Sequence, residues 1–460
     1  MNREETETVY ELKNEIESNK SCFKRNAAYF EGSQRLAAMG LAVPKDLQQL
    51  QTVVNWCGTY LGAINGRQKI EDFRLAGEAG AVDRLRDWWQ ANNLDEESDL
   101  AHLEALVQGR CYITVGYDED DPATPVFTVE SPESMYARIN PRTRKVESAL
   151  KIYERNENSE PKSIALYFPN ETVYAEYGGS PNGWRETDRV QHNLGVVPVV
   201  PMVNRTRIND RDGTTEMRDV MGLTDAACRT LTNLQGAQEL MALPQRYVLG
   251  ATEDILQDAN GEAIPSWQAY IANILTIPSD PDSGDVSVGQ FSAADLRNFT
   301  EVIRTYETLV CSVTGLPTHY LGLSTENPAS ADAIRSSEGR LVKIVERKNS
   351  AFESAWEQAM RIGIMLVDGE LDARFRRLET VWRNPATPTM SEKADAVRKL
   401  AGTNEPLIDR QSALEMMGMS PEEVQKIMDR MGNDPLNNLL SMVGENGSGG
   451  VQQSSKEDIG

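Results

Sequence analysis

The sequence has few of the residues on which most metal binding and catalysis depend. It contains three histidines, His102, His192 and His319, and no two of them lie at the spacing of metal ligands. It also lacks the Gly-x-x-x-x-Gly-Lys-Ser/Thr loop that holds nucleotide phosphates. These absences argue against zinc chemistry, histidine-dependent catalysis and P-loop ATP hydrolysis. We therefore expect no enzymatic activity, no bound metal and no cofactor.

Long apolar runs and closely spaced cysteines are missing as well. No apolar run approaches the ~20 residues that a membrane helix needs, and no apolar segment follows the acidic start Met1–Glu7 as it would in a secretory signal. The five cysteines are dispersed, a pattern typical of reduced thiols packed as small apolar residues. They are Cys22, Cys57, Cys111, Cys228 and Cys311. We expect assembly in a cytoplasm, without membrane contact.

Basic residues are scarce relative to acidic ones. The chain has 47 Lys and Arg against 70 Asp and Glu, a net charge of −23 over 460 residues. Tight binding of nucleic acid requires clustered basic residues that displace counterions from phosphates, so this balance argues against a protein that grips DNA or RNA. The composition, 40% hydrophobic and 25% charged, is ordinary for a folded chain with a substantial core.

The first 205 residues alternate between a helical and a strand period, which predicts an α+β domain. Helices are expected at Val9–Ile16 and at Leu47–Ile64, the second capped by Asp46. Two β-hairpins and two further strands should follow. Their strands are expected at Cys111–Tyr117 with Val126–Val129, Met135–Ile139 with Val146–Tyr153, Ile164–Phe168 and Thr172–Tyr177.

Three long helices are predicted in the second half, which makes the fold predominantly helical. Apolar residues recur every three to four positions over 214–243, over 292–314 with Ser292 as cap, and over 331–366. Residues 244–291 read as short strands, Tyr247–Leu249 and Ile274–Ile277, among acidic loops. A helix of about 36 residues spans over ~50 Å, too long for one chain of this size to cover its apolar stripe alone. Lateral association of copies into a ring is the simplest way to bury these apolar stripes.

Two local clusters allow more than one interpretation. Asp118–Asp121 lies between two predicted strands, and its carboxylates could form a calcium loop or the divalent-metal site of a nuclease. The turn glycine and the bidentate glutamate of a calcium loop are absent, so a solvated hairpin tip is the favoured interpretation. Residues 244–291 hold seven acidic side chains and one basic side chain, which fit either a solvated surface or an acidic tip in a ring.

The order of motifs resembles the portal proteins of tailed double-stranded-DNA bacteriophages, in the siphovirus-like branch of actinobacterial phages. The most specific motif is Thr314–Gly322 followed by Asn327–Arg335, after a helix–insert–helix layout. The other motifs are Tyr29–Leu36, Leu106–Val115, Val197–Arg205, Leu223–Ala226 and Leu243–Gly250.

The resemblance implies a dodecameric ring at one capsid vertex, through which DNA enters during packaging and leaves during ejection. It implies a virion protein assembled in the host cytoplasm. Its parts would be a wing, a stem of two helices flanking a clip, a tunnel loop, a long kinked helix with a wing return, a crown and a disordered tail. The wing would be 1–213, the stem helices 214–243 and 292–314, and the clip between them 244–291. The tunnel loop would be 315–330, the long helix with the wing return 331–385, the crown 386–445 and the disordered tail 446–460.

The resemblance also suggests contact residues and partners. Ser324, Thr325, Glu326 and Asn327 would face DNA from the tunnel loop, and Lys343, Arg347 and Lys348 would be the basic residues of the inner helix. The partners implied are other copies, DNA that passes without sequence reading, the large terminase subunit, the head–tail adaptor, and the major capsid and scaffolding proteins. The clip residues that would meet terminase or adaptor are Glu253, Asp254, Asp258, Glu262, Asp280, Asp282 and Asp285.

One alternative fits the long helices and the charge equally well. A capsid or tail adaptor, or a scaffold protein, would also form oligomers but would enclose no DNA. The mass of the assembly and the presence of a central hole separate these two interpretations.

Overall fold

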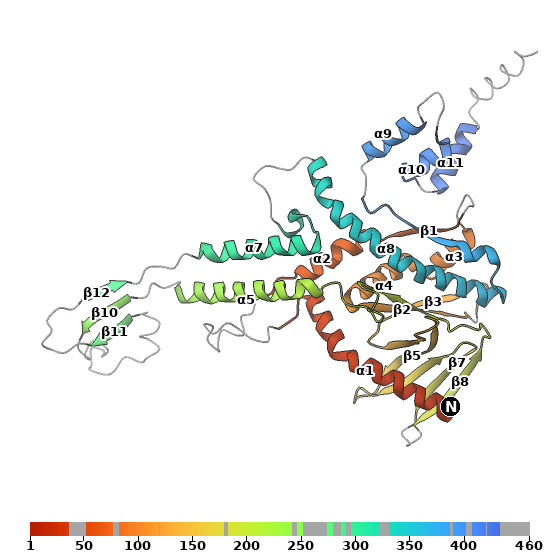
Figure 1. Cartoon of the computed structure of the whole chain (residues 1–460), viewed down its shortest axis with the longest axis horizontal. Helices are drawn as coiled ribbons and strands as arrows, with labels where there is room; N and C mark the ends of the chain where they lie inside the picture. Colours follow the sequence, from red (N-terminus) through yellow and green to blue (C-terminus); the bar gives the residue numbers. More distant parts are fainter. Residues whose placement is uncertain are drawn as a thin grey trace, which may run out of the picture. The chain divides into compact units, whose positions relative to one another are not determined.

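The computed structural model divides the chain into two units, Met1–Pro385 and Ala386–Gly460, which are described separately. Figure 1 shows their helices and strands. The structure describes residues 1–35, 52–76, 82–118, 120–178, 183–241, 246–251, 274–278, 287–290, 296–322, 331–386, 390–401, 407–419 and 421–432.

A five-stranded antiparallel sheet and the first helix form one layer pair of the first unit. The helix α1 (Arg3–Glu31) starts with a capping box, in which Asn2 and Glu5 each bond the backbone N–H of the other. One face of α1, with Val9, Leu12 and Ile16, packs on the sheet. The sheet order β4-β5-β6-β7-β8 follows the chain. Its strands are β4 (Met135–Ile139), β5 (Val146–Arg155), β6 (Pro161–Tyr167), β7 (Glu171–Tyr177) and β8 (Trp184–Gln191).

A second, three-stranded sheet lies against helices in the main core. Its order is β3-β2-β9, all antiparallel, with β2 in the centre. Both predicted hairpins are confirmed, because β2 pairs with β3 and β4 pairs with β5. The ranges are β2 (Arg110–Gly116), β3 (Val126–Glu130) and β9 (Val199–Val203), with α2 (Trp56–Asn65), α3 (Asp83–Ala91) and α4 (Leu94–Gln108) beside them.

The long helix α8 (Ala331–Asp368) runs through this core. Trp356 is fully buried, and its ring centroid lies 5.1 Å from that of Trp89 in α3. The indole Nε1 of Trp356 donates to Nε2 of the buried His102 at 2.9 Å. A short ladder then closes the unit, since β1 (Ile70–Leu75) pairs with β13 (Leu378–Trp382), some 300 residues later in the chain. The same core therefore joins the beginning and the end of the first unit.

Two glycines allow the close approach that leads into the fifth helix. Gly109 has φ of +91° and Gly213 has φ of +77°, both in the left-handed region that glycine tolerates best. A Cβ on Gly213 would lie 2.0 Å from the carbonyl oxygen of Gly109. Only glycine at position 213 therefore lets the two backbone segments meet.

The three long helices predicted from the sequence are confirmed, with changed ends. They are α5 (Arg218–Met241), α7 (Arg297–Thr314) and α8, which has 38 residues. Helix α7 ends at Thr314, as predicted, and Gly315 follows it in the left-handed conformation. The predicted cap Ser292 lies outside the described residues. Between the helices, three strands form a sheet of order β11-β10-β12: β10 (Arg246–Ala251), β11 (Ile274–Pro278) and β12 (Ser287–Gln290).

The prediction of one helix over 47–64 is wrong in its first part. Residues 52–55 are not helical, and α2 begins at Trp56. Asn55 caps it, because its side-chain oxygen accepts a hydrogen bond from the backbone N–H of Gly58 at 2.8 Å. The predicted cap Asp46 lies outside the described residues.

The described part of the second unit consists of short helices. They are α9 (Met390–Ala401), α10 (Arg410–Met416) and α11 (Pro421–Gly432). Ala413 and Val424 are its buried apolar side chains within the described ranges. The tail 446–460 lies outside those ranges.

All five cysteines are free, and four of them are buried as small apolar residues. No described helix combines the length and the apolar character required to cross a bilayer.

Candidate functional site

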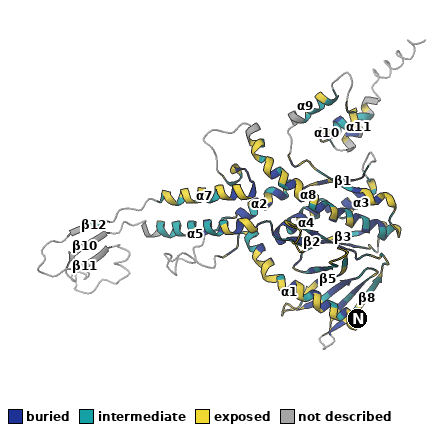
Figure 2. Cartoon of the chain, viewed as in Figure 1, coloured by how far each residue is buried: buried dark blue, intermediate teal, exposed yellow. Residues whose placement is uncertain are grey.

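Helices α5 and α7 lie side by side, and α7 leaves much of its apolar stripe uncovered. Figure 1 shows the pair, and Figure 2 shows α7 with many exposed residues. Within its described length α7 buries only Val310, Cys311 and Thr314, all in its last two turns. Val302, Leu309 and Val313 are 41%, 44% and 50% exposed. Apolar side chains in this periodic arrangement form a surface that a second helix can cover.

A buried ion pair fixes the base of this helix pair to α8. The Lys348 ammonium lies 2.5 Å from Oε2 of Glu216 and donates to Oδ1 of Asn204 at 2.7 Å. Lys348 is only 1% exposed. Glu216 also accepts hydrogen bonds from the Asn204 amide at 3.1 Å and the Tyr60 hydroxyl at 3.2 Å. The pair therefore joins α8, the start of α5, the end of β9 and α2.

The pKa values of these groups follow from burial and mutual attraction. Burial would raise the pKa of Glu216, but the Lys348 ammonium and the donors from Asn204 and Tyr60 hold it below its usual value. Burial lowers the pKa of Lys348, opposed by the Glu216 charge. Each group is the other's main charged neighbour, so their mutual attraction favours the ionised form of both. Burial and the Glu216 charge raise the pKa of Tyr60, which stays a donor.

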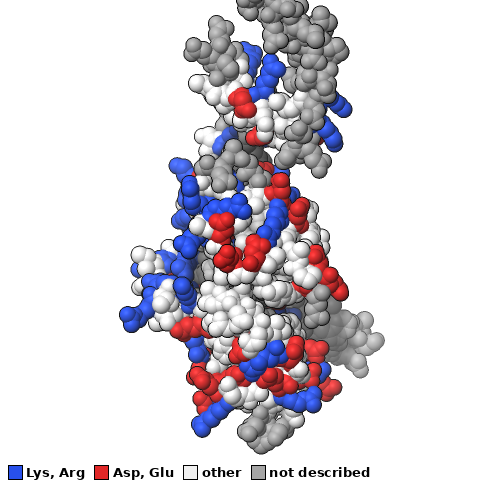
Figure 3. All heavy atoms as spheres, turned by 90° about the vertical axis from the view of Figure 1, so that its right-hand side faces the viewer, with Lys and Arg blue, Asp and Glu red and all other residues white. Residues whose placement is uncertain are grey.

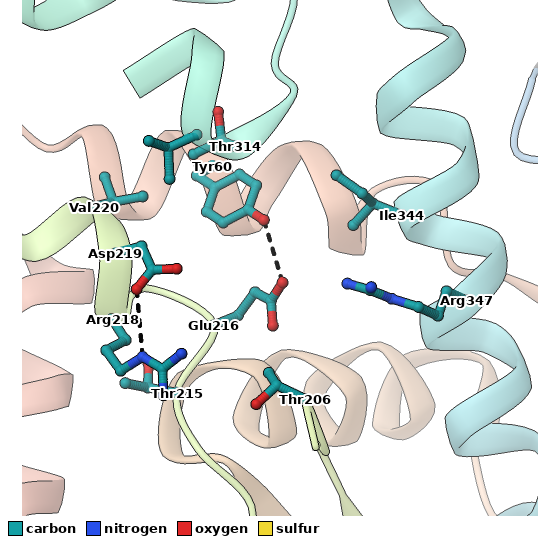
Figure 4. A pocket seen from close by; sticks show the side chains of 11 residues that line it. Tyr60, Thr206, Thr215, Glu216, Arg218, Asp219, Val220, Thr314, Ile344 and Arg347 are labelled. Carbon is teal, nitrogen blue, oxygen red and sulfur yellow. Dashed lines mark hydrogen bonds and ion pairs between the residues drawn. The ribbon is translucent and has the colours of Figure 1, made fainter. Parts of the chain in front are cut away.

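A pocket of about 220 Å³ opens beside this ion pair, between α5, α7 and α8. Figure 4 shows Tyr60 and Glu216 in contact, with Ile344 and Arg347 of α8 on the opposite wall. Arg218 and Asp219 pair with each other at 3.3 Å at the start of α5. The walls combine apolar, acidic and basic groups, and among the described residues no three His, Cys, Asp or Glu side chains gather as metal ligands. The pocket is therefore a gap at the packing interface of three helices.

A second ion pair holds the segment after α7. The 3-10 turn η3 (Thr318–Leu321) follows Gly315. The Arg67 guanidinium bonds the Tyr320 hydroxyl at 2.9 Å and the Glu338 carboxylate of α8 at 2.9 Å. The other guanidinium nitrogen donates to the carbonyl of Pro385 at 2.8 Å. Arg67 thus fastens η3, the first third of α8 and the last residue of the first unit to one point.

The structure separates the three basic residues predicted on the inner helix. Lys343 and Arg347 are exposed on α8. Lys348 is buried and paired with Glu216, so the prediction that it is a basic residue facing DNA is wrong. The predicted tunnel-loop residues Ser324, Thr325, Glu326 and Asn327 lie outside the described residues. So do the predicted clip residues Glu253, Asp254, Asp258, Glu262, Asp280, Asp282 and Asp285.

The described residues of the acidic run, Asp118, Asp120 and Asp121, lie in the hairpin connection between β2 and β3. The Asp118 carboxylate accepts from the backbone N–H of Asp120 at 2.9 Å. The Asp121 carboxylate accepts from the backbone of Ala123 at 3.2 Å. The side chains therefore serve the turn, as the favoured interpretation held.

The position of Lys348 in the sequence is a signal for the buried ion pair. Lys348 follows Leu341 by seven residues and precedes Phe352 by four, so it falls on the apolar line of α8. A lysine on a buried line requires a buried acidic partner. The partner itself, 132 residues earlier, carries no local signal.

The comparisons with known proteins agree on one family. A family model described as "Phage portal protein, SPP1 Gp6-like" matches residues 4–432. The portal protein of Mycobacterium phage L5 is 40% identical over 412 residues, 87% of this chain and 83% of that protein. The portal protein of Mycobacterium phage D29 is 39% identical over 427 residues, 91% of this chain and 86% of that protein.

Solved structures with a partial likeness to this chain include chains of gene transfer agent (GTA) particles. A chain of "Neck of empty GTA particle computed with C6 symmetry" has a TM-score of 0.44 at 13% identity and covers 84% of this chain and 96% of its own length. A chain of "Neck of native GTA particle computed with C12 symmetry" has a TM-score of 0.42 at 13% identity and covers 86% and 99%. On the family model and the two relatives, this chain belongs to the SPP1 Gp6-like phage portal protein family.

Proposed function

We propose that this chain forms the portal ring at one vertex of a phage capsid. Twelve copies surround a channel that double-stranded DNA enters during terminase-driven packaging and leaves during ejection. The same ring is the docking platform for the head–tail adaptor. The observation that carries the proposal is the family match over residues 4–432 together with the uncovered apolar stripe of α7.

The parts of the ring follow the order of the described elements. Helices α5 and α7 form the stem, and the sheet β11-β10-β12 belongs to the clip. Residues 1–213 with 331–385 form the wing and its return around α8, and 386–445 form the crown. Two ion pairs support this division, Glu216–Lys348 and Arg67–Glu338. Each attaches a segment next to a proposed stem helix to the core of the proposed wing.

The charge of the chain suits a conduit through which DNA slides. Each chain carries −23, so twelve carry about −276, and a channel wall of this sign repels phosphates. Acidic and basic side chains are interspersed on the face shown in Figure 3, without a continuous basic cover. A few exposed bases reduce the repulsion locally, and Lys343 and Arg347 of α8 fill this role. Ser324, Thr325, Glu326 and Asn327 offer polar contacts that read no sequence.

The partners in this role are proteins of the phage particle and its packaging machinery. The large terminase subunit and later the adaptor meet the clip, through Glu253, Asp254, Asp258, Glu262, Asp280, Asp282 and Asp285. The major capsid and scaffolding proteins meet the wing. The ring is a structural part of the virion, built in the host cytoplasm, and the hydrolysis of ATP belongs to the terminase.

The mass of the assembly tests the proposal. Twelve chains of 51.1 kDa give about 610 kDa, which light scattering after size exclusion measures directly. A mass that corresponds to a ring supports a portal. A dimer or trimer that persists at high protein concentration contradicts it and favours an adaptor or scaffold.

A further inference from the structure

A groove of about 520 Å³ lies on the wing between α1, α4 and the end of β3. Its floor is apolar, with Phe30 of α1 and Leu100, Leu103 and Val107 of α4. Leu100 is 52% exposed. The groove thus offers an apolar contact surface that the described chain leaves uncovered.

The rim of the groove is acidic without any counter-charge. Neither lysine nor arginine lines it, and none of its four carboxylates forms an ion pair within the described ranges. They belong to Glu31, Glu97, Glu104 and Glu133. Burial raises the pKa of Glu104 because it disfavours the charged carboxylate, and a nearby cation would favour that charged form. We name this surface the acidic groove.

A buried amide in the groove points to a missing hydrogen-bond donor. Gln108 lines the groove and is only 5% exposed. Its Nε2 donates to the Phe23 carbonyl and to the Glu133 carboxylate, both at 3.3 Å. Its Oε1 accepts no hydrogen bond from the described chain. A buried acceptor without a partner is costly, and a guanidinium entering the groove would satisfy it.

The loop between β9 and α5 has the complementary chemistry. Ile208 is 85% exposed, more than any other large apolar side chain that the structure describes. Arg205, Arg207 and Arg211 flank it, all exposed, and none of the three side chains has a described partner. We call residues 205–211 the Ile208 loop. An apolar tip among unpaired arginines is the composition typical of an interface anchor.

The Ile208 loop is held in shape by its own bonds. The Asp210 carboxylate accepts from the Thr206 hydroxyl and from the backbone N–H of Arg207, the latter at 3.2 Å. The Asp210 N–H donates back to the Arg207 carbonyl at 3.1 Å. Beyond the loop, Asp212 is paired with Arg110 at 3.3 Å. The loop therefore presents Ile208 outward without further ordering, which lowers the entropy lost on binding.

We propose that the Ile208 loop of one copy of this chain docks in the acidic groove of the next copy. Ile208 covers the apolar floor beside Leu100, and the arginines meet the rim carboxylates and Gln108. The two surfaces are different, so the contact is head-to-tail, the type that closes into a ring when the rotation allows. The inference rests on the proposed ring and adds the wing contact between its neighbours.

Cross-linking between engineered cysteines tests the contact. In a Cys22→Ser background, which removes the one exposed native thiol, Ile208→Cys is combined with Leu100→Cys and treated with a short bis-maleimide. Head-to-tail docking predicts a ladder of covalent oligomers on a denaturing gel. The matched control pairs Ile208→Cys with Tyr153→Cys, since Tyr153 is 50% exposed on β5, outside the groove. This pair should stay monomeric.

The outcomes separate this inference from the proposed ring. A ring by light scattering whose Ile208→Cys/Leu100→Cys variant gives no cross-link contradicts the docking and leaves the ring standing. Covalent dimers without longer products also contradict it, since they indicate a reciprocal contact. A protein without higher oligomers contradicts the ring itself.

A charge exchange provides a second readout. Arg207→Glu should reduce the cross-link yield at least tenfold, because it places a carboxylate among the rim acids. Adding Glu97→Arg should restore most of it. Failure of the double variant to recover, while both variants elute at the position of the parent chain, contradicts the pairing of loop and rim.

Discussion

Substitution of Lys348 by methionine should destabilise the first unit strongly. Methionine keeps most of the volume but removes the cation that neutralises Glu216, whose side chain is 8% exposed. Breaking a buried ion pair on one side costs ~3–5 kcal/mol. The Asn204 amide and the Tyr60 hydroxyl still donate to Glu216, so the lower end, ~3 kcal/mol, applies here.

The double variant separates the charge from the packing. Lys348→Met with Glu216→Gln removes both charges, and the glutamine oxygen can still accept from Asn204 and Tyr60. Because two desolvated charges disappear together, most of the loss should be recovered. Lys343→Met on the exposed side of α8 is the matched control and should change stability by less than ~0.5 kcal/mol.

Urea unfolding followed by tryptophan fluorescence measures the effect, because Trp89 and Trp356 are buried in the core that contains α8. With a slope of ~3 kcal/mol per M, Lys348→Met lowers the midpoint by about 1 M. All variants are compared at one protein concentration, since assembly adds stability. A Lys348→Met midpoint equal to that of Lys343→Met, or a double variant as weak as the single one, refutes the reasoning.

Three further substitutions test other parts of the structure. Burial lowers the pKa of His102 to about 3 from 6.5, so the native state loses stability as pH falls from 6.5 towards 3, and His102→Gln should flatten this decline in pH-dependent unfolding curves. Gly213→Ala should abolish soluble protein because its Cβ meets the Gly109 carbonyl, whereas Gly222→Ala in α5 has open space and should leave the melting temperature unchanged or higher. Leu309→Lys should leave the circular dichroism spectrum intact but lower the fraction of assembled protein severalfold in size exclusion, since Leu309 is 44% exposed on α7; unchanged assembly would show that this face is not covered by a neighbour.

Local patterns in the sequence predicted the elements whose causes are local. The hairpins β2–β3 and β4–β5 follow from strand alternation around polar turns, and the C-terminal end of α7 follows from Gly315. Helix α8 was predicted within two residues at its end, because its apolar period is long and regular.

Features that depend on distant residues could not be predicted in the same way. The strands β1 and β13 pair across 300 residues, and neither strand indicates its partner. Residues 52–55 are not helical because Asn55 caps α2. The spacing of apolar residues alone does not indicate where this helix begins. The resemblance implies that Lys348 is one of the basic residues of the inner helix, although its position on the apolar line of α8 indicates burial. The partners of Arg67 lie in η3, in α8 and at Pro385, far from Arg67 in the sequence, so these contacts become apparent only in the folded structure.

Electron microscopy of the purified full-length chain, viewed end-on, tests the central claim most directly. The account predicts closed annuli with a central hole that admits a DNA duplex, built from repeated copies with the stem helices in lateral contact. Particles without a hole, or well-folded monomers at high concentration, would contradict it.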